Sequence, residues 1–204
     1  MMRPYLKDPA AIYAQSFATV REEARLDRFD PGMAALATRV IHACGMIEVA
    51  DRLAFSSGAF VAGQAALAAG APVLCDCQMV AAGVIRRSLP AENEVIVTLN
   101  EASVVALAGD LGTTRSAAAV ELWRDRIEGA VVAIGNAPTA LFHLLERLDE
   151  GWPKPAVILG FPVGFVGAIE SKDALWQTQP VPCCTIHGRL GGSAITVATI
   201  NAVA

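Results

Sequence analysis

The stretch Ala130-Val-Val-Ala-Ile-Gly-Asn-Ala-Pro138 decides the fold class of this chain. Its first five residues form an apolar run that predicts a strand buried on both faces. Gly135-Asn-Ala-Pro138 ends that run and introduces a helical pattern over residues 139–149. A second apolar run follows at residues 156–160. A strand, a helix and another strand in this order predict a βαβ unit, and therefore a parallel sheet.

The same alternation continues along the rest of the chain. Further strands are predicted near residues 72–75, 95–98 and 183–187. Helices are predicted around them, at residues 9–26, 31–44, 58–69, 103–110, 114–127, 168–175 and 193–204. Continuous apolar strands separated by helices are typical of a sheet that is covered on both faces. We expect a three-layer α/β/α fold with a mainly parallel sheet of about five strands, within a single domain of residues 1–204.

The composition excludes some classes of protein. Of the 204 residues, 54% are hydrophobic and 18% are charged, and the formal net charge is −4. This balance argues against binding to nucleic acid or to an anionic membrane surface. The uncharged residues 54–75 are interrupted by Ser, Gly, Gln and Pro, which is not the pattern of a membrane span. The low share of charge favours an oligomer that covers part of the surface.

Cysteine usage indicates the compartment. The odd number and the lack of framework spacing point to a reducing, cytoplasmic setting, and no apolar signal core is found near residue 1. No second Cys or His pair has the spacing of a zinc site, so we expect buried thiols and no metal. The five cysteines are Cys44, Cys75, Cys77, Cys183 and Cys184.

The predicted strand ends are rich in turn-forming and polar residues. In open parallel sheets, ligands bind beyond the carboxyl ends of the strands. Glycines in such loops let the backbone approach a ligand closely. Any doubly wound fold needs turns at these places, but Gly, Asn and Ser recur at successive strand ends, which favours a pocket. The loops are residues 76–79, 135–138, 160–167 and 188–193.

His42 stands at the end of a predicted helix, one turn after Arg39. Asp30-Pro31 supplies an N-cap and a first-turn proline, and Gly45 is expected to end the helix. Met33, Leu36, Ala37, Val40 and Cys44 form one apolar stripe, and at about 100° per residue His42 falls opposite Met33. His42 therefore faces water or a cleft. A helix C-terminus favours the imidazolium, which suits a proton donor.

Anion-binding groups are expected outside this helix. Gly112-Thr-Thr-Arg115-Ser116 opens a helix whose amides, hydroxyls and Arg115 could hold a carboxylate or a phosphate. The alternative is an ordinary N-cap with a solvated arginine. Arg189 is a further candidate, and so are Arg86 and Arg87.

Several reaction classes lack their motifs. The first strand is not followed by Gly-x-Gly-x-x-Gly, and the chain has no Walker A loop and no Gly-x-Ser-x-Gly elbow. This weighs against a nicotinamide, flavin or nucleotide-triphosphate enzyme. A histidine acid, an anion-binding rim and no cofactor motif indicate an isomerase or lyase that acts on a polyanionic organic substrate.

Taken together, eight collinear motifs resemble the precorrin-8X methylmutase family over nearly the whole chain. They are residues 5–17, 41–45, 70–76, 114–118, 134–140, 162–167, 170–172 and 188–193. The resemblance implies an α/β homodimer of cobalamin biosynthesis that holds its substrate near the subunit interface. Members of this family move a methyl group from C-11 to C-12 of precorrin-8X to give hydrogenobyrinate, without a methyl donor or another cofactor.

The resemblance also implies roles for particular residues. His42, in the Ile-His-Ala-Cys-Gly motif, corresponds to the family histidine that assists by protonating the macrocycle. Other enzymes of the corrin pathway are implied as possible partners, and neither nucleic acid nor a membrane is. The residues that the motifs place at the substrate are Ser16, Arg115, Ser116, Asn136, Gly164, Glu170, Ser171, Lys172, Arg189, Gly192 and Ser193.

Three positions depart from the family pattern and leave alternatives open. Ile85 stands where the family commonly has threonine, Cys77 where it often has alanine, and His187 where arginine is common. The alternatives are the same chemistry on cobalt-precorrin-8, a corrinoid carrier without turnover, and an enzyme of another polyacid. His42 could also orient the ring by a hydrogen bond instead of donating a proton.

Overall fold

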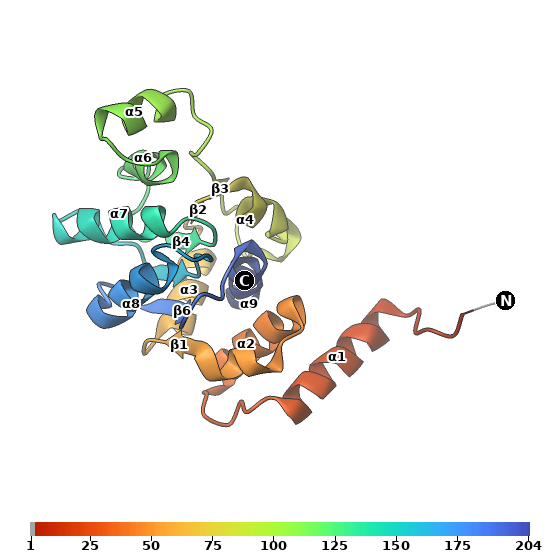
Figure 1. The fold of residues 1–204 in the computed structure, drawn as a ribbon. Helices are drawn as coiled ribbons and strands as arrows, with labels where there is room; N and C mark the ends of the chain where they lie inside the picture. Colours follow the sequence, from red (N-terminus) through yellow and green to blue (C-terminus); the bar gives the residue numbers. More distant parts are fainter. Residues whose placement is uncertain (1–2) are drawn as a thin grey trace.

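The computed structural model describes residues 3–204, in which six strands form one sheet (Figure 1). The strand order is β1-β6-β5-β4-β2-β3, and all neighbours pair in parallel except β1 and β6. This confirms the predicted α/β class. The strands are β1 (Leu53–Phe55), β2 (Val73–Cys75), β3 (Val95–Ile96), β4 (Val131–Ile134), β5 (Val157–Gly160) and β6 (Cys183–Ile186).

Helices connect most of these strands. The α-helices are α1 (Pro9–Glu23), α2 (Pro31–Cys44), α3 (Ala59–Ala68), α4 (Gln78–Gly83), α5 (Val104–Asp110), α6 (Arg115–Glu121), α7 (Pro138–Asp149), α8 (Ala168–Thr178) and α9 (Ser193–Val203). Two short 3₁₀ helices, η1 (Ile47–Arg52) and η2 (Arg86–Ser88), precede β1 and follow α4.

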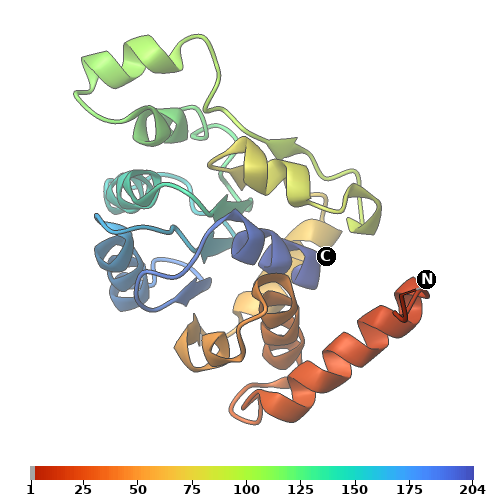
Figure 2. The same ribbon diagram turned by 45° about the vertical axis from the view of Figure 1, so that its right-hand side comes forward.

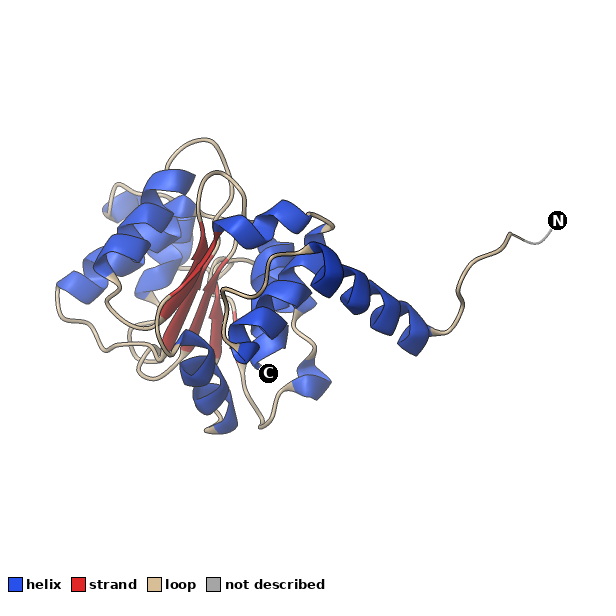
Figure 3. Ribbon diagram, turned by 90° about the horizontal axis from the view of Figure 1, so that it is seen from below, coloured by secondary structure: helices blue, strands red, loops and turns tan. Residues whose placement is uncertain are grey.

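Alternate residues of each central strand enter two separate cores. In β4, Val131 and Ala133 pack with α2, α3, α4 and α9, whereas Val132 and Ile134 pack with α7 and α8. Figure 3 shows the strands between these two groups of helices. Because every residue of β4, β5 and β6 is buried, these strands have no polar face. This explains why they read as continuous apolar runs in the sequence.

The structure differs from the sequence prediction in a few elements. β1 is an additional antiparallel edge strand, so the sheet has six strands and not five. α4 (Gln78–Gly83) is not predicted; it begins inside residues 76–79, for which the sequence predicts a loop. β3 is shorter than predicted. The helix predicted over residues 114–127 is also shorter: α6 ends at Glu121, and turns follow over residues 122–126.

Helix α1 stands apart from the sheet and its two helical layers (Figures 1 and 2). Its N-cap, Asp8, accepts hydrogen bonds from Ala10 N and Ala11 N at 3.2 and 3.3 Å. Val20 is its only buried residue, and a small apolar cluster joins it to Ile41 and Ala50. The helix is therefore held to the body along one narrow face, next to α2.

Candidate active site

The side chain of His42, on α2, faces α1. Among residues 3–204 it has one hydrogen-bond partner. Ser16 Oγ is 2.8 Å from His42 Nδ1. The rings of Tyr13 and Phe17, from the same helix as Ser16, lie 5.2 and 5.3 Å from the imidazole between centroids. The residue is exposed, as the helical periodicity predicts. Since Ser16 engages Nδ1, Nε2 is the nitrogen left for a ligand.

Local sequence explains this position. Gly45 ends α2 in the left-handed conformation with φ of 71°, and its N–H donates to Ile41 O at 2.7 Å. Asp30 Oδ1 caps the other end by accepting from Met33 N at 3.0 Å. Leu36, Ala37 and Val40 are fully buried. Packing of that stripe turns His42 outward, in the last turn of α2.

A cavity of about 140 Å³ opens beside the imidazole. Its walls are mostly apolar and come from α1, α2, α9 and the segment after α4. The lining residues are Tyr13, Arg39, His42, Ala43, Ile85, Ala194, Val197, Ala198 and Asn201. Asn201 Oδ1 accepts from Ile85 N at 2.9 Å, which ties the segment after α4 to α9. The departure at Ile85 thus lies in the same cavity as His42.

The glycine-rich loops form a connected rim beyond β5 and β6. Gly192 N donates to Phe161 O at 2.8 Å, and Gly164 N donates to Arg189 O at 3.4 Å. The Arg189 guanidinium lies over the Phe165 ring, 5.2 Å from its centroid. Ser193, which starts α9, directly precedes Ala194 in the wall of the His42 cavity. The rim and the cavity therefore meet at the start of α9.

Ser171 and Lys172 lie beneath this rim, not on its surface. Both are fully buried. Lys172 Nζ donates to Leu190 O, in the loop that carries Arg189 and Gly192. Desolvation lowers the pKa of Lys172 to about 8, partly opposed by the charge of Asp173. The structure thus gives Lys172 a place under the loop, and direct contact with substrate stays a prediction.

Asp76 occupies the point where the strand order reverses, between β2 and β4. Its carboxylate accepts three backbone hydrogen bonds, from Gly135 N at 3.0 Å, Asn136 N at 2.8 Å and Ala137 N at 2.9 Å. Burial raises the pKa of Asp76, and these amides oppose the rise. In many doubly wound folds a ligand binds at such a point. Here a side chain of the protein fills the anion position before α7.

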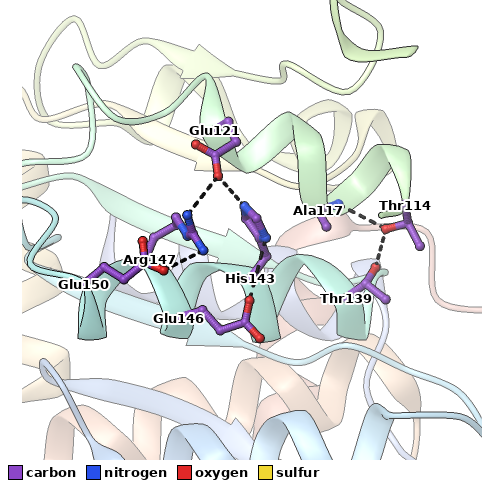
Figure 4. Close-up of polar contacts among 8 residues, drawn as sticks. All are labelled: Thr114, Ala117, Glu121, Thr139, His143, Glu146, Arg147 and Glu150. Atoms are coloured by element: carbon purple, nitrogen blue, oxygen red, sulfur yellow. Dashed lines mark hydrogen bonds and ion pairs between the residues drawn. The ribbon is translucent and has the colours of Figure 1, made fainter. Parts of the chain in front are cut away.

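Arg115 and Ser116 lie on a helical hairpin, α5 and α6, away from His42 (Figure 1). Arg115 Nη2 donates to Leu99 O and Asn100 Oδ1, both at 3.2 Å. Thr114 Oγ1 accepts from Ala117 N at 3.2 Å, which is the N-cap expected as the alternative reading (Figure 4). The structure does not bring Arg115 into the cavity of His42.

The remaining polar candidates take other positions. His143 Nε2 lies 2.6 Å from Glu121 Oε1 and joins α7 to α6, beside Arg147 (Figure 4). It is a structural histidine. Asn136 follows β4 and is exposed, and Glu170 is exposed in the first turn of α8. His187 Nδ1 lies 3.7 Å from Asp173 Oδ1.

Sequence reasoning missed several residues around His42. Tyr13 and Phe17 belong to a quoted motif, but their contact with the imidazole depends on how α1 packs on α2. Val197 and Asn201 come from the last helix, which the sequence predicts without a role. The spacing of Tyr13, Ser16 and Phe17, one turn apart on one helix face, is the signal that could have grouped them.

A larger cavity, about 410 Å³, lies along the edge strand β1 and contains none of the predicted site residues. Its lining is of mixed charge, with Asp30 and Asp51 beside Arg28 and His187. Residues 3–204 hold no group of three or more His, Cys, Asp or Glu side chains that could bind a metal ion. In the same range, no helix combines the length and the apolar character that crossing a membrane requires.

The fold and the site define an α/β enzyme with a histidine beside an apolar cavity and without a phosphate-binding glycine loop. The family model described as precorrin-8X methylmutase matches residues 11–204. The chain belongs to the precorrin-8X methylmutase family, which is a family of isomerases.

Individual relatives agree with this assignment. The chain is 61% identical to precorrin-8X methylmutase of Pseudomonas aeruginosa over 100% of this chain and 98% of that protein. It is 36% identical to cobalt-precorrin-8 methylmutase of Priestia megaterium over 98% of this chain and 89% of that protein. A crystal structure of precorrin-8X methyl mutase from Thermus thermophilus superposes with a TM-score of 0.87 at 40% identity, covering 95% of this chain and 94% of that one.

Proposed function

We propose that this chain moves a methyl group from C-11 to C-12 of precorrin-8X to give hydrogenobyrinate, with His42 as the general acid. The reaction is an isomerisation within cobalamin biosynthesis and needs no methyl donor. The observation that carries the role of His42 is its position: Ser16 engages Nδ1 at 2.8 Å, and Nε2 is left beside an apolar cavity.

The geometry supports proton donation from Nε2. When the imidazole is protonated, Nδ1–H donates to Ser16 Oγ and Nε2–H is free to protonate the macrocycle. A protonated ring withdraws electron density, which stabilises the charge that shifts as the methyl group migrates. After the transfer, Nδ1–H still donates to Ser16. Ser16 therefore holds the imidazole of His42 in one orientation in both of its protonation states.

The substrate side chains suit the surface next to the cavity. Precorrin-8X carries several carboxylates, and the rim offers Arg189 together with backbone groups of Gly164 and Gly192. These residues, with Asn136 and Ser193, are the substrate-binding candidates that the fold supports best. Arg115 and Ser116 lie on the α5–α6 hairpin, away from α2 (Figure 1), and with Glu170 they stay as predictions.

Metal-free precorrin-8X is the substrate that the relatives favour. The proteins that share 61% and 57% identity with this chain are named precorrin-8X methylmutase, whereas those named cobalt-precorrin-8 methylmutase share 36% or less. Because identity falls by about twenty points between the two groups, the metal-free substrate is our proposal. Offering both substrates to the purified protein tests it directly.

A homodimer would complete the site. The His42 cavity holds about 140 Å³, whereas sites that enclose a small-molecule ligand hold about 300–1,000 Å³. Large apolar side chains of α1 and of the segment before it remain exposed, at Tyr13 in the wall of this cavity with 53% and at Tyr5 with 70% of their surface accessible. A second copy that covers this face would hide these side chains and enlarge the cavity.

The five free cysteines support a reducing, cytoplasmic setting.

The experiment is incubation of the purified protein with precorrin-8X, without added cofactor, followed by absorption spectroscopy. The wild type should give orange hydrogenobyrinate. His42→Ala should lower turnover by about 10²–10⁴-fold and keep product binding, because general acid catalysis supplies an effect of that size. Ser16→Ala should lower turnover less, about 10-fold.

The matched control is Thr19→Val, which removes a hydroxyl from the same helix. Thr19 Oγ1 donates to Gln15 O and does not contact His42. Normal turnover by His42→Ala would refute the acid role. If the wild type binds hydrogenobyrinate but converts no precorrin-8X, the chain is a corrinoid carrier, a reading that Ile85 in the His42 cavity would then explain.

A further inference from the structure

Arg39 shares a cavity with His42. It lies three residues earlier on the exposed side of α2 and lines the same space of about 140 Å³. Residues at this spacing are neighbours on a helix surface. A ligand group that contacts His42 in this cavity therefore lies close to Arg39 as well.

The guanidinium of Arg39 has no partner among residues 3–204. It makes neither a hydrogen bond nor an ion pair there, although other arginines of the chain do. Those with a carboxylate partner are Arg25 with Asp51, Arg126 with Glu94 and Arg147 with Glu150. Arg115 is also engaged, by Leu99 O and Asn100. Arg39 is thus a charged fork without a counter-charge from its own chain.

The walls of the cavity contain no carboxylate either. They are apolar apart from Tyr13, Arg39, His42 and Asn201, and Asn201 already bonds to Ile85 N and Gly83 O. The space therefore combines an apolar lining with one permanent positive charge. Such a lining accepts the edge of an apolar ring that carries an acidic arm, and it disfavours a cationic ligand.

We infer that Arg39 binds a carboxylate arm of the macrocycle and so determines which edge of the ring meets Nε2 of His42. The inference rests on the proposed function and adds a substrate-binding residue to it. Arginine suits this task because its planar fork holds a carboxylate through two parallel hydrogen bonds. Lysine offers only a point charge and would fix the arm less firmly.

The test is titration of hydrogenobyrinate into the wild type, Arg39→Lys and Arg39→Met, followed by the change in absorption. Arg39→Met keeps the apolar stem and loses the charge. It should raise the Kd for hydrogenobyrinate about 10–100-fold, the effect expected for loss of a charge-assisted pair. The Kd of Arg39→Lys should lie between those of the wild type and Arg39→Met. The control is Arg124→Met, an exposed arginine near Trp152 on the other side of the sheet, which should leave Kd unchanged.

A second ligand separates loss of a charge pair from loss of shape. Hydrogenobyrinate with esterified carboxylates should bind the wild type and Arg39→Met alike, because its arms are neutral. If Arg39→Met binds the free acid as the wild type does, or loses both ligands equally, the inference is wrong. The proposed function fails separately, when the wild type does not convert precorrin-8X.

Discussion

Replacing Lys172 by methionine tests what the buried ammonium beneath the rim contributes to the free energy of unfolding. Lys172 is fully buried, its Nζ donates to Leu190 O, and no carboxylate lies within ion-pair distance of it among residues 3–204. An unpaired buried ammonium is costly. Methionine fills similar space without the charge, so the variant should be more stable than the wild type at pH 7.

The size of the effect follows from the pKa. Desolvation lowers the pKa of Lys172 from 10.5 to about 8, which corresponds to at most about 3 kcal/mol of folding free energy. Loss of the hydrogen bond to Leu190 O should cost about 1 kcal/mol. The expected gain in the free energy of unfolding at pH 7 is therefore about 2 kcal/mol.

The pH dependence gives the sharper test. Because the folded pKa lies below the unfolded one, the cost of the ammonium is complete below pH 8 and disappears as the pH rises toward 10.5. The advantage of Lys172→Met should thus vanish, or change sign, by pH 10. The wild type alone is uninformative, because burial raises the pKa of thiols such as Cys183, which destabilises the fold above pH 9.

The assay is urea unfolding of both proteins at intervals from pH 7 to pH 10, followed by circular dichroism. Lys154→Met is the control, since this lysine is exposed and its removal should change stability equally at every pH. A difference between Lys172→Met and the wild type that stays constant over this range would refute the argument.

Two further substitutions probe the loops at the carboxyl ends of the strands by urea unfolding and product binding. Gly191→Ala should cost about 2–5 kcal/mol and weaken binding, because its φ is 153° and a Cβ would lie 2.3 Å from Phe161 O; Gly109→Ala, with open space around it, is the control. Equal stability of these two variants would contradict the strain argument. Asp76→Asn should cost about 2 kcal/mol or more, because the three amides of residues 135–137 lose a charged acceptor. Asp110→Asn, at the exposed end of α5, should be neutral, and a neutral Asp76→Asn would mean that these amides find other partners.

The sequence predicts the central fold well because burial leaves a simple pattern. Residues 131–134, 157–160 and 183–186 are buried on both faces, so their apolar runs identify the strands without an alignment. The sequence pattern does not predict β1. It has three residues, follows η1 directly and ends at a turn, so neither alternation nor a long apolar run marks it.

The candidate site is only partly predictable. The periodicity of α2 turns His42 outward, because angle along a helix depends on sequence spacing alone. The contact with Ser16 and the distance to Arg115 depend on how α1 and α6 pack, which no spacing encodes. Lys172 is the clearest difference, since a charged residue in an amphipathic helix is expected in water and here is fully buried.

The narrow attachment of α1 separates the stability of the surroundings of His42, the proposed general acid, from that of the sheet. The hydroxyl and both aromatic rings around His42 come from this one helix, while the sheet and its two cores do not involve it. Segments with few buried contacts open at lower free energy than the core. If His42 is the general acid, we expect mild denaturing conditions to detach α1 and lower activity while the sheet is still folded, so that loss of activity and loss of structure have different midpoints.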